Sequence, residues 1–334
     1  MNVPLSIPRS SAASEFIYGT SAVKAALRAR TRKLYKLYIY HGEGRTEDRG
    51  SDKEFFKLAE RCGLEVERLG EGADDVRLLS KMSQGRPHNG YVLEASQLPM
   101  TPVEGLDSVT SPGDGFTFTP SHQSAEEVAV NGNSSKVSGK SDRYPFVLML
   151  DSILDPGNLG AIIRSAAFFG VDAIGLVDNN LAPFSPVTLK ASSGAAEHMP
   201  YLKIKKDIDF VRRSQSNGWK FFAAVAPESA SASRGGPNAI TLRDAEHALR
   251  KGPCVLILGG EGDGLRPRLQ KAADEMIGIE GAVGLNSEMG LDSLNVSVAA
   301  ALMMQIFVKG SNAKAGSKAS ARETHDAKED GLLF

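Results

Sequence analysis

Cysteine is scarce in this chain, which has only Cys62 and Cys254 among its 334 residues. Neither lies in a Cys-x-x-Cys or Cys-x-x-His pattern, so we expect no disulfide framework and no metal site. Long apolar runs are missing too, because no stretch approaches the ~20 apolar residues that a membrane helix needs. We therefore expect no membrane partner.

Net charge is also small, and the N-terminus is poor in charged residues. A formal net charge of −1 does not exclude a nucleic-acid partner, because a basic site can be local on a neutral protein. Residues 1–15 are rich in serine, contain Arg9 and have no acid before Glu15. They lack a secretory hydrophobic segment and resemble a short, arginine-poor mitochondrial presequence. We interpret residues 1–15 as a disordered or targeting segment, and whether it is cleaved stays open.

What the chain does have is a regular alternation of helix and strand patterns. Its length suggests two domains, and a hydrophobic content of 41% is enough for two cores. In residues 16–97, helical spacing and strand-like runs predict a small α/β domain. The predicted helices cover 20–34, 52–63 and 73–84, and the predicted strands cover 35–40, 64–69 and 88–98.

The pattern stops in residues 98–143. In the stretch 101–143, 22 of 43 residues are Gly, Ser, Pro, Thr or Asn, so few side chains can be buried there. Ordering such a segment would cost more conformational entropy than burial returns. We expect a flexible, low-complexity linker or surface insertion.

From residue 144 to 309 the alternation resumes with longer elements. Continuous apolar strands separated by helices are typical of a mostly parallel sheet with helices on both faces, which places the chain in the α/β class. The polar tail, residues 310–334, is expected to be disordered. The strands are expected near 145–150, 172–177, 220–225, 254–260 and 274–280.

Polar and glycine residues follow three of these strands. The three stretches are LDSILDPGNLGAIIR, LGGEGDGLRPRL and GLDSLNVSVAA. In open α/β sheets, ligands bind beyond the carboxyl ends of the strands. These three stretches are therefore the candidate site.

The glycine-rich stretch is not a dinucleotide loop. After Gly260 and Gly262 the Gly-x-Gly-x-x-Gly pattern needs glycine at position 265, which is Leu265, and no Gly-Lys-Ser/Thr follows. Glu261 would repel a phosphate, so bare backbone amides with one carboxylate suit a neutral or cationic ligand better. A simple tight turn at Gly259–Gly264 is the alternative.

Asn158 and Arg164 lie six residues apart in the first stretch. On a helix that spacing is about 9 Å of axial rise. Apolar residues flank Arg164 on both sides, and an apolar setting is costly for a guanidinium unless an anion pairs with it. That anion could be a phosphate or the carboxylate of a structural ion pair.

The third stretch contains Ser293, Asn295 and Ser297 at alternate positions before an apolar helix. Ser and Asn are good helix N-caps, but one cap needs only one such residue. The pattern indicates either a redundant cap on a buried helix or a cap that also belongs to the site.

Basic residues are concentrated near the start of the first domain. Residues 16–42 contain six basic residues, including Lys24, Arg28, Arg30 and Arg32, and no acid, and Tyr35, Tyr38 and Tyr40 are interleaved with the bases. Basic helices with aromatics suit phosphate contact and base stacking, so we predict RNA binding by these four side chains. A solvated helix face is the alternative.

Taken together and in order, the three stretches resemble the TrmH/SpoU branch of the SPOUT methyltransferases, which are RNA ribose 2′-O-methyltransferases. The resemblance covers about 145–308, and SPVTLKASSGAAEHMP is similar to the segment that the family places between the motifs. FIYGTSAVKAAL and HNGYVLEA look like the start and end of the family's substrate-binding domain. The two-domain layout is most similar to the large-subunit ribosomal RNA guanosine methyltransferases. Among these enzymes, the fungal mitochondrial members look most like this chain in three features, which are the GGEG motif, the insertion and the tail.

The resemblance implies a C-terminal trefoil knot, an exception to unknotted topology, and a homodimer. It implies that S-adenosylmethionine binds in the knot through backbone groups, which by position belong to Gly259, Ile279 and Leu294. The family's functional polar residues correspond to Asn158, Arg164, Glu261, Ser293 and Asn295. Many members have Asn-Glu-Gly where this chain has Gly260-Glu261-Gly262, which removes one side-chain hydrogen bond near the donor.

By this resemblance we expect S-adenosylmethionine-dependent methylation of a guanosine ribose in mitochondrial large-subunit ribosomal RNA. Arg164 would hold the phosphate of the target nucleotide, while Glu261 or a water takes the proton, because arginine is effectively always protonated. A transfer-RNA ribose methyltransferase, a non-catalytic ribosomal RNA-binding assembly factor and a cytoplasmic location are the alternatives. A nicotinamide oxidoreductase is disfavoured by the failed glycine spacing.

Overall fold

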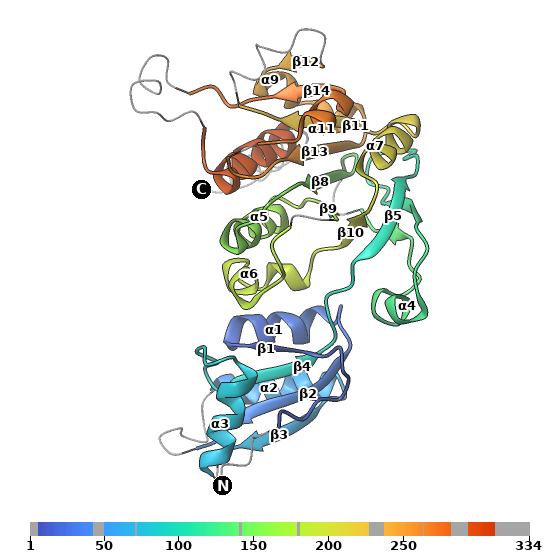
Figure 1. Cartoon of the computed structure of the whole chain (residues 1–334). Coiled ribbons are helices and arrows are strands. Elements are labelled where there is room, and N and C mark those ends of the chain that lie inside the picture. The colour runs from blue at the N-terminus through green and yellow to red at the C-terminus, as the bar shows by residue number, and fades with distance from the viewer. Residues whose placement is uncertain are drawn as a thin grey trace, which may run out of the picture.

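The computed structural model describes residues 6–42, 50–70, 72–139, 142–178, 181–226, 237–262, 264–281 and 293–310. These residues form two sheets, one of four strands and one of ten. Figure 1 shows the smaller sheet at the N-terminal end of an elongated chain, with the larger sheet above it. Among the described residues no helix is long and apolar enough to cross a membrane.

The smaller sheet has the strand order β1-β4-β2-β3, in which β2 and β3 are parallel and the other pairs are antiparallel. Apolar residues of α1 and α2 pack on one face of this sheet, and those of α3 pack on the other. The predicted α/β domain is therefore present. Its elements are β1 (Glu15–Tyr18), α1 (Thr20–Ala29), β2 (Leu34–Tyr40), α2 (Gly50–Arg61), β3 (Glu65–Leu69), α3 (Ala73–Met82) and β4 (Tyr91–Ala95).

The larger sheet has the order β12-β14-β11-β13-β8-β9-β10-β5-β6-β7, and all its pairs from β12 to β5 are parallel. The mostly parallel sheet predicted from the continuous apolar strands is thus confirmed. The parallel strands after the insertion are β8 (Phe146–Leu150), β9 (Ala173–Val177), β10 (Tyr201–Ile204), β11 (Lys220–Ala224), β12 (Asn238–Ile240), β13 (Cys254–Leu258) and β14 (Glu275–Ile277).

Helices cover both faces of this sheet because both faces of its strands are apolar. Leu148 packs in one core with α5, α6 and the C-terminal helix over residues 296–310, whereas Val147 packs in another with α7 and α11. Phe307 of the C-terminal helix stacks on Phe146, with ring centroids 4.9 Å apart. The helices are α5 (Pro156–Phe168), α6 (Pro186–Ala191), η1 (Ala195–Glu197), α7 (Asp207–Ser216), α9 (Leu242–Ala245), α10 (Ala248–Lys251) and α11 (Pro267–Ala272).

The segment expected to be a flexible linker or a surface insertion is a folded insertion, so the prediction of a flexible linker was wrong. It forms β5 (Thr101–Leu106), β6 (Phe116–Pro120), α4 (Ala125–Asn131) and β7 (Lys136–Val137), which extend the large sheet beyond β10. The apolar residues of its strands are spaced so that they reach the core, and sheet pairing satisfies the strand backbone. The buried residues are Val103, Leu106, Phe116, Phe118 and Val137.

The part of the N-terminal segment that the structure describes is ordered as well, contrary to the expectation for residues 1–15. Glu94 of β4 is only 1% exposed and needs donors. Ser10 supplies two, from its backbone N (2.6 Å) and its Oγ (2.8 Å), and Ser14 Oγ supplies a third (2.7 Å). These bonds hold residues 10–14 against the small sheet. Residues 1–5 and the predicted tail 311–334 lie outside the described residues.

The implied knot stays a prediction. Residues 282–292, which connect β14 to the C-terminal helix, lie outside the described part of the chain. The sheet order does show the crossovers that precede those residues, because β13 lies between β8 and β11, and β14 pairs on the far side of β11.

Arg32 joins the two domains and is not exposed to RNA, so its predicted role as an RNA contact was wrong. Its side chain is 1% exposed and donates to both carboxylate oxygens of Glu197 in η1, at 2.9 and 3.0 Å. It also bonds Glu15 Oε2 at 3.0 Å and the Ser96 carbonyl at 2.9 Å. The neighbouring Thr31 hydroxyl donates to the Glu197 carbonyl. A guanidinium with a carboxylate on each side can be buried without RNA.

We predict that removing one partner of the buried pair destabilises the protein more than removing both. Arg32→Met or Glu197→Leu alone leaves an uncompensated buried charge and should lower the free energy of unfolding by about 3–5 kcal/mol. The double variant should lose less than either single variant. Denaturant unfolding of the three variants measures the difference.

The control is Arg213→Met, which breaks an exposed ion pair with Glu104, and should change stability by less than about 1 kcal/mol. Wild-type stability in both single variants would contradict a buried interdomain ion pair.

Candidate functional site

The three stretches singled out in the sequence lie together at the carboxyl ends of β8 and β13 and at the start of the C-terminal helix. Asp155 caps α5, because its side chain accepts the backbone N–H of Asn158, at 2.7 Å, and Pro156 starts the first turn. This cap sets Asn158 in the first turn of α5. The parallel pairing of β8 and β13 places the glycine loop beside it.

Asn158, Glu261 and Asn295 form one hydrogen-bonded cluster. Glu261 Oε1 accepts from Asn158 Nδ2 at 2.7 Å and from Asn295 Nδ2 at 2.6 Å, and Asn295 Nδ2 also lies 3.2 Å from Asn158 Oδ1. Asn158 and Asn295 are 137 residues apart in the sequence. The fold thus brings one carboxylate and two amides to a solvent-accessible point, an arrangement able to hold a polar ligand or accept a proton.

Asn295 caps the C-terminal helix and belongs to this cluster. Its Oδ1 accepts from the backbone N (2.9 Å) and the Oγ (2.6 Å) of Ser297. With Oδ1 occupied by these donors, Nδ2 has to face Glu261, so the cap orients the amide. The alternate Ser and Asn residues are therefore not redundant. Ser293 is exposed and makes no hydrogen bond with another described residue.

The glycine loop has no room for side chains at its first two positions. A Cβ at Gly259 would lie 2.3 Å from the backbone N of Leu265, and one at Gly260 would lie 2.2 Å from the carbonyl O of Ser152. Ser152 itself has a left-handed backbone (φ 60°), which directs its carbonyl at the loop. Gly260 in place of the family's asparagine therefore accompanies direct backbone contact between the two loops, where the sequence suggested only a lost hydrogen bond.

An ion-pair network that was missed in the sequence supports this contact. Asp151, fully buried at the end of β8, accepts from Arg266 Nε at 2.7 Å and Nη2 at 2.5 Å. Arg266 also bonds Asp207 Oδ2 at 2.8 Å, which Arg268 shares at 2.6 Å. The hydrogen bonds to Asp151 raise the pKa of Arg266. The sequence did contain a signal for this network, namely an aspartate directly after an apolar strand and an arginine two residues after the last glycine of the loop.

Arg164 lies outside the cluster. It is exposed, contrary to the buried setting that its apolar neighbours suggested, and makes no hydrogen bond or ion pair with any described residue. Each residue of a helix is rotated by 100° from the one before it, so Arg164 lies about 120° around α5 from Asn158. The two side chains therefore project from different faces of the helix. Its predicted role needs a contact that one copy of the described chain does not make.

The predicted donor-binding residues lie on the three loops in different environments. Gly259 is buried, Ile279 is half-buried against the core, and Leu294 is 49% exposed. Most of the connection between the last two, residues 282–292, lies outside the described residues. Whether the three line one pocket stays a prediction. Their chemistry fits a nucleoside with a cationic centre, because they combine glycine backbone and apolar side chains, and the Glu261 carboxylate lies two residues from Gly259.

The other side chains predicted to contact RNA differ in whether they are free to do so. Lys24 and Arg28 both pair with Glu54, at 2.5 and 2.6 Å, and the hydrogen bond from Lys24 lowers the pKa of that carboxyl. Arg30 is exposed at the C-cap of α1. Of the interleaved tyrosines, Tyr38 is buried, which raises its pKa to about 12 and removes it from base stacking.

Both cysteines are free thiols, and burial raises the pKa of Cys254 to about 12, which makes it a poor nucleophile. Among the described residues no group of three or more His, Cys, Asp or Glu side chains could hold a metal ion.

Both domains of this chain match known protein families. Residues 145–305 match the SpoU rRNA methylase family, and residues 16–101 match the RNA 2′-O ribose methyltransferase substrate-binding family. The mitochondrial rRNA methyltransferase 1 of Saccharomyces cerevisiae is 31% identical over 87% of this chain and 68% of its own length. The protein of that name from Schizosaccharomyces pombe is 31% identical over 88% and 90%.

More distant relatives share the layout. The 23S rRNA (guanosine-2′-O-)-methyltransferase RlmB of Vibrio parahaemolyticus is 26% identical over 87% of this chain and 95% of its own length. The crystal structure of an AdoMet-bound rRNA methyltransferase from Sinorhizobium meliloti superimposes with a TM-score of 0.58 at 22% identity, covering 88% of this chain and 87% of that one. With both domains matched in order, and with relatives 31% identical over most of the chain, the protein belongs to the SpoU family of RNA ribose methyltransferases.

Proposed function

We propose that this protein transfers a methyl group from S-adenosylmethionine to the ribose 2′-hydroxyl of a guanosine in large-subunit ribosomal RNA. The observation that carries the proposal is the cluster of Asn158, Glu261 and Asn295, built from the first turn of α5, the glycine loop and the N-cap of the C-terminal helix in a SpoU-family fold. The names of the relatives support the substrate, because they include ribosomal RNA and, in RlmB, a guanosine 2′-oxygen.

S-adenosylmethionine is the expected donor, and it supplies an electrophilic methyl group on a sulfonium. Gly259, Ile279 and Leu294 would hold its nucleoside, since glycine leaves backbone groups bare and Leu294 offers an exposed apolar surface. Glu261 would favour the positive sulfonium by charge. This assignment agrees with the sequence-based expectation of a neutral or cationic ligand.

In the proposed mechanism, the chain orients the ribose and removes its proton. Asn158 and Asn295 fix Glu261 Oε1 by two hydrogen bonds, which leaves the carboxylate positioned to accept the 2′-hydroxyl proton directly or through a water. Ser293, adjacent to the cap, would contact the reacting ends. Positioning should supply much of the rate enhancement, because the donor is intrinsically reactive.

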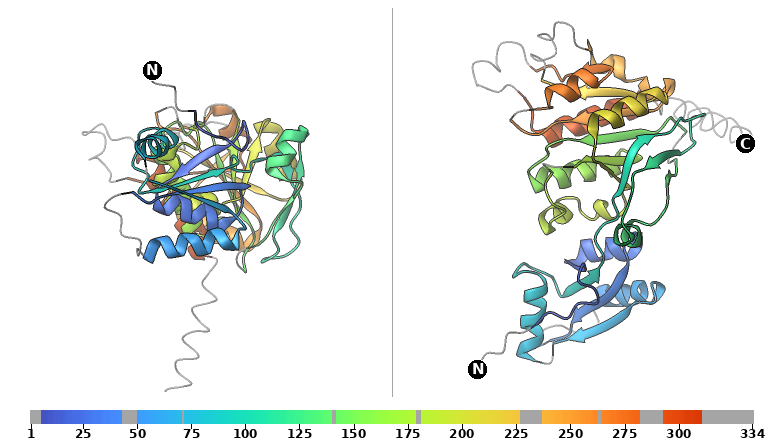
Figure 2. Two further views of the ribbon diagram at one scale, coloured as in Figure 1. Left: turned by 90° about the horizontal axis from the view of Figure 1, so that it is seen from below. Right: turned by 45° about the vertical axis from the view of Figure 1, so that its right-hand side comes forward.

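A homodimer would complete this site. Val298 and Leu302 lie four residues apart on the C-terminal helix and are 48% and 40% exposed, which forms an apolar stripe, and Leu294 (49% exposed) lies just before this helix. Phe168 of α5, a helix that lies beside the C-terminal helix in Figures 1 and 2, is 83% exposed. Exposed apolar residues in this number mark an interaction surface. Arg164 lies one turn before Phe168 on α5. In the proposed dimer it would therefore face the partner copy and the phosphate of the RNA bound there.

A mitochondrial location is proposed on the relatives named as mitochondrial. A cytoplasmic location is the alternative.

The proposal is tested by mapping ribose methylation in cells with and without this protein. We expect one guanosine in mitochondrial large-subunit ribosomal RNA to lose its methyl group, and to regain it when the wild-type chain is restored. Loss of methylation only in transfer RNA, or no loss in any RNA, would contradict the proposed substrate.

Glu261→Gln should lower kcat by a factor of about 100 or more, because glutamine keeps the shape and loses the proton acceptor. We expect stability to change by less than about 0.5 kcal/mol, since Glu261 is exposed. Asp209→Asn, at an exposed residue of α7, removes the same charge elsewhere and should leave the methylation rate unchanged. Single-turnover methylation of the mapped RNA measures the effect, and an unchanged rate in Glu261→Gln would rule out this proton acceptor.

Arg164→Ala should abolish methyl transfer and leave donor binding nearly intact. If Arg164 acts across the dimer, mixing Arg164→Ala with Glu261→Gln subunits restores one complete site in each mixed dimer. Activity should then recover toward roughly a quarter of the wild-type level, because half of the dimers are mixed. Turnover by refolded or co-expressed mixtures measures this recovery, and no recovery would mean that Arg164 acts within its own chain.

A further inference from the structure

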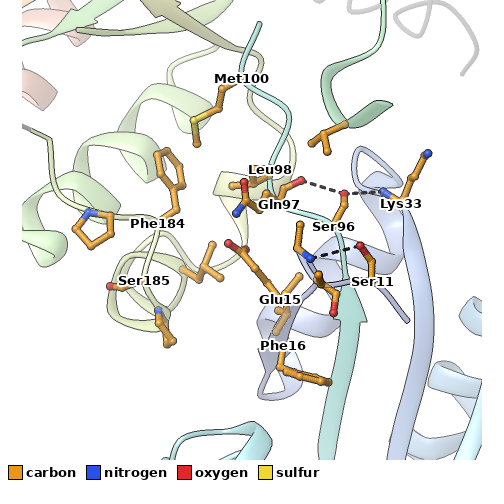
Figure 3. A pocket seen from close by; sticks show the side chains of 18 of the residues that line it. Ser11, Glu15, Phe16, Lys33, Ser96, Gln97, Leu98, Met100, Phe184 and Ser185 are labelled. Carbon is orange, nitrogen blue, oxygen red and sulfur yellow. Dashed lines mark hydrogen bonds between the residues drawn. The ribbon is translucent and has the colours of Figure 1, made fainter. Parts of the chain in front are cut away.

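A large cavity lies between the two domains, separate from the Asn158–Glu261–Asn295 cluster. Its volume is about 1550 Å³. It is lined by the small sheet, by the segment Ser96–Met100 that joins the domains, by α4 of the insertion and by the loop between β9 and α6. Figure 3 shows Lys33, Gln97, Met100 and Phe184 around this space, although they come from different parts of the chain.

The walls of this cavity are held in place by hydrogen bonds. The buried pair of Arg32 and Glu197 joins the two domains beside it. On the other side, Asn131 Oδ1 of α4 accepts from the backbone N of Met100 at 2.8 Å, and its Nδ2 donates to Gln123 at 2.8 Å. The insertion therefore forms a wall that the two domains alone would lack, and the cavity exists before any ligand binds.

The cavity reaches the same edge of the sheet as the proposed catalytic cluster. Leu176–Asp178, at the carboxyl end of β9, line it, and β9 is the neighbour of β8. The loop that follows β9 returns to the first motif, because the backbone N of Ala182 donates to the carbonyl of Ile153 at 2.7 Å. Neighbouring strands are about 4.8 Å apart. A ligand that extends from the end of β8 would enter the cavity within a few nucleotide lengths.

The lining suits nucleobases better than phosphates. Phe16, Tyr35 and Phe184 are half-buried and offer ring surface, and Gln97 offers an amide. Aromatic rings stack on unpaired bases of any sequence, and amides bond to their edges. Basic and acidic residues both occur in the lining, and some are paired, as Lys203 is with Asp178 at 3.3 Å. Lys33 is exposed at the rim, where a backbone phosphate could pass.

The size of the cavity argues against a small metabolite. Pockets for small molecules usually measure roughly 300–1,000 Å³. A cavity of about 1550 Å³ has room for more than one nucleotide.

We propose that this interdomain cavity binds unpaired nucleotides of the substrate RNA that flank the methylated guanosine, by stacking on Tyr35 and Phe184. The identity of the RNA rests on the proposed function. The inference adds the place where that RNA binds and the single-stranded state of the nucleotides beside the guanosine. The insertion around α4 thereby takes part in substrate choice.

The test measures the RNA affinity of the full-length chain by anisotropy, and KM and kcat by methylation. Two synthetic RNAs carry the mapped guanosine, one with its natural single-stranded flanks and one trimmed to the target stem-loop. The variants are Tyr35→Leu and Phe184→Leu, which keep apolar volume and remove the ring. Phe56→Leu, a half-buried aromatic of α2 outside the cavity, is the matched control.

We expect each variant to weaken binding and raise KM for the flanked RNA roughly tenfold, because base–aromatic stacking has that effect per base. The turnover number, donor affinity and binding of the trimmed RNA should match those of the wild type and of Phe56→Leu. Equal loss on both RNAs, or no loss on either, would overturn the proposal, and the second result would leave the cavity to a different occupant such as a ribosomal protein. Absence of methylation by the wild type refutes the proposed function, whereas the binding arm tests the cavity independently.

Discussion

The direct backbone contact between the loops that follow β8 and β13 determines the geometry of the candidate site. Gly260 lies against the Ser152 carbonyl so closely that no Cβ fits, and the buried Asp151–Arg266 pair holds the two loops together on the side of the core. A buried carboxylate without its arginine would be strongly unfavourable, so this pairing constrains both loops at once. Glu261, the next residue in the glycine loop, is thereby brought within hydrogen-bonding reach of Asn158.

The same principle of a buried, fully bonded charge recurs at two other joints of the molecule. Arg32 and Glu197 hold the domains together, and Glu94 secures the N-terminal segment through Ser10 and Ser14. Each of these charges would be costly if it were unpaired, and each is bonded only when segments far apart in the sequence have met. They therefore specify how the pieces fit more than they add to stability.

Amino-acid composition wrongly predicted disorder in the insertion, where a few apolar residues lie at positions that reach the core. The insertion is rich in small and polar residues, yet its buried side chains and its pairing with β10 make it part of the sheet. An edge strand needs only its backbone and one apolar face to join a sheet that already exists. A prediction of disorder from composition counts residue types and takes no account of the existing sheet on which the insertion can pair. The insertion then places α4 at the interdomain cavity, where it takes part in the proposed function.

The sequence by itself determined the α/β class and the two-domain order, and its resemblance to a known family assigned Asn158, Glu261 and Asn295 to one site. Apolar periodicity and glycine and cap residues are local signals, and they act through backbone sterics and burial that a short stretch already contains. Only the tertiary structure decided that Arg32 is buried against Glu197, that Arg164 is exposed and apart from Asn158, and that Arg266 supports Asp151. The environment of a charged side chain is set by groups that arrive from distant segments, and no local pattern of residues encodes which of them it will meet.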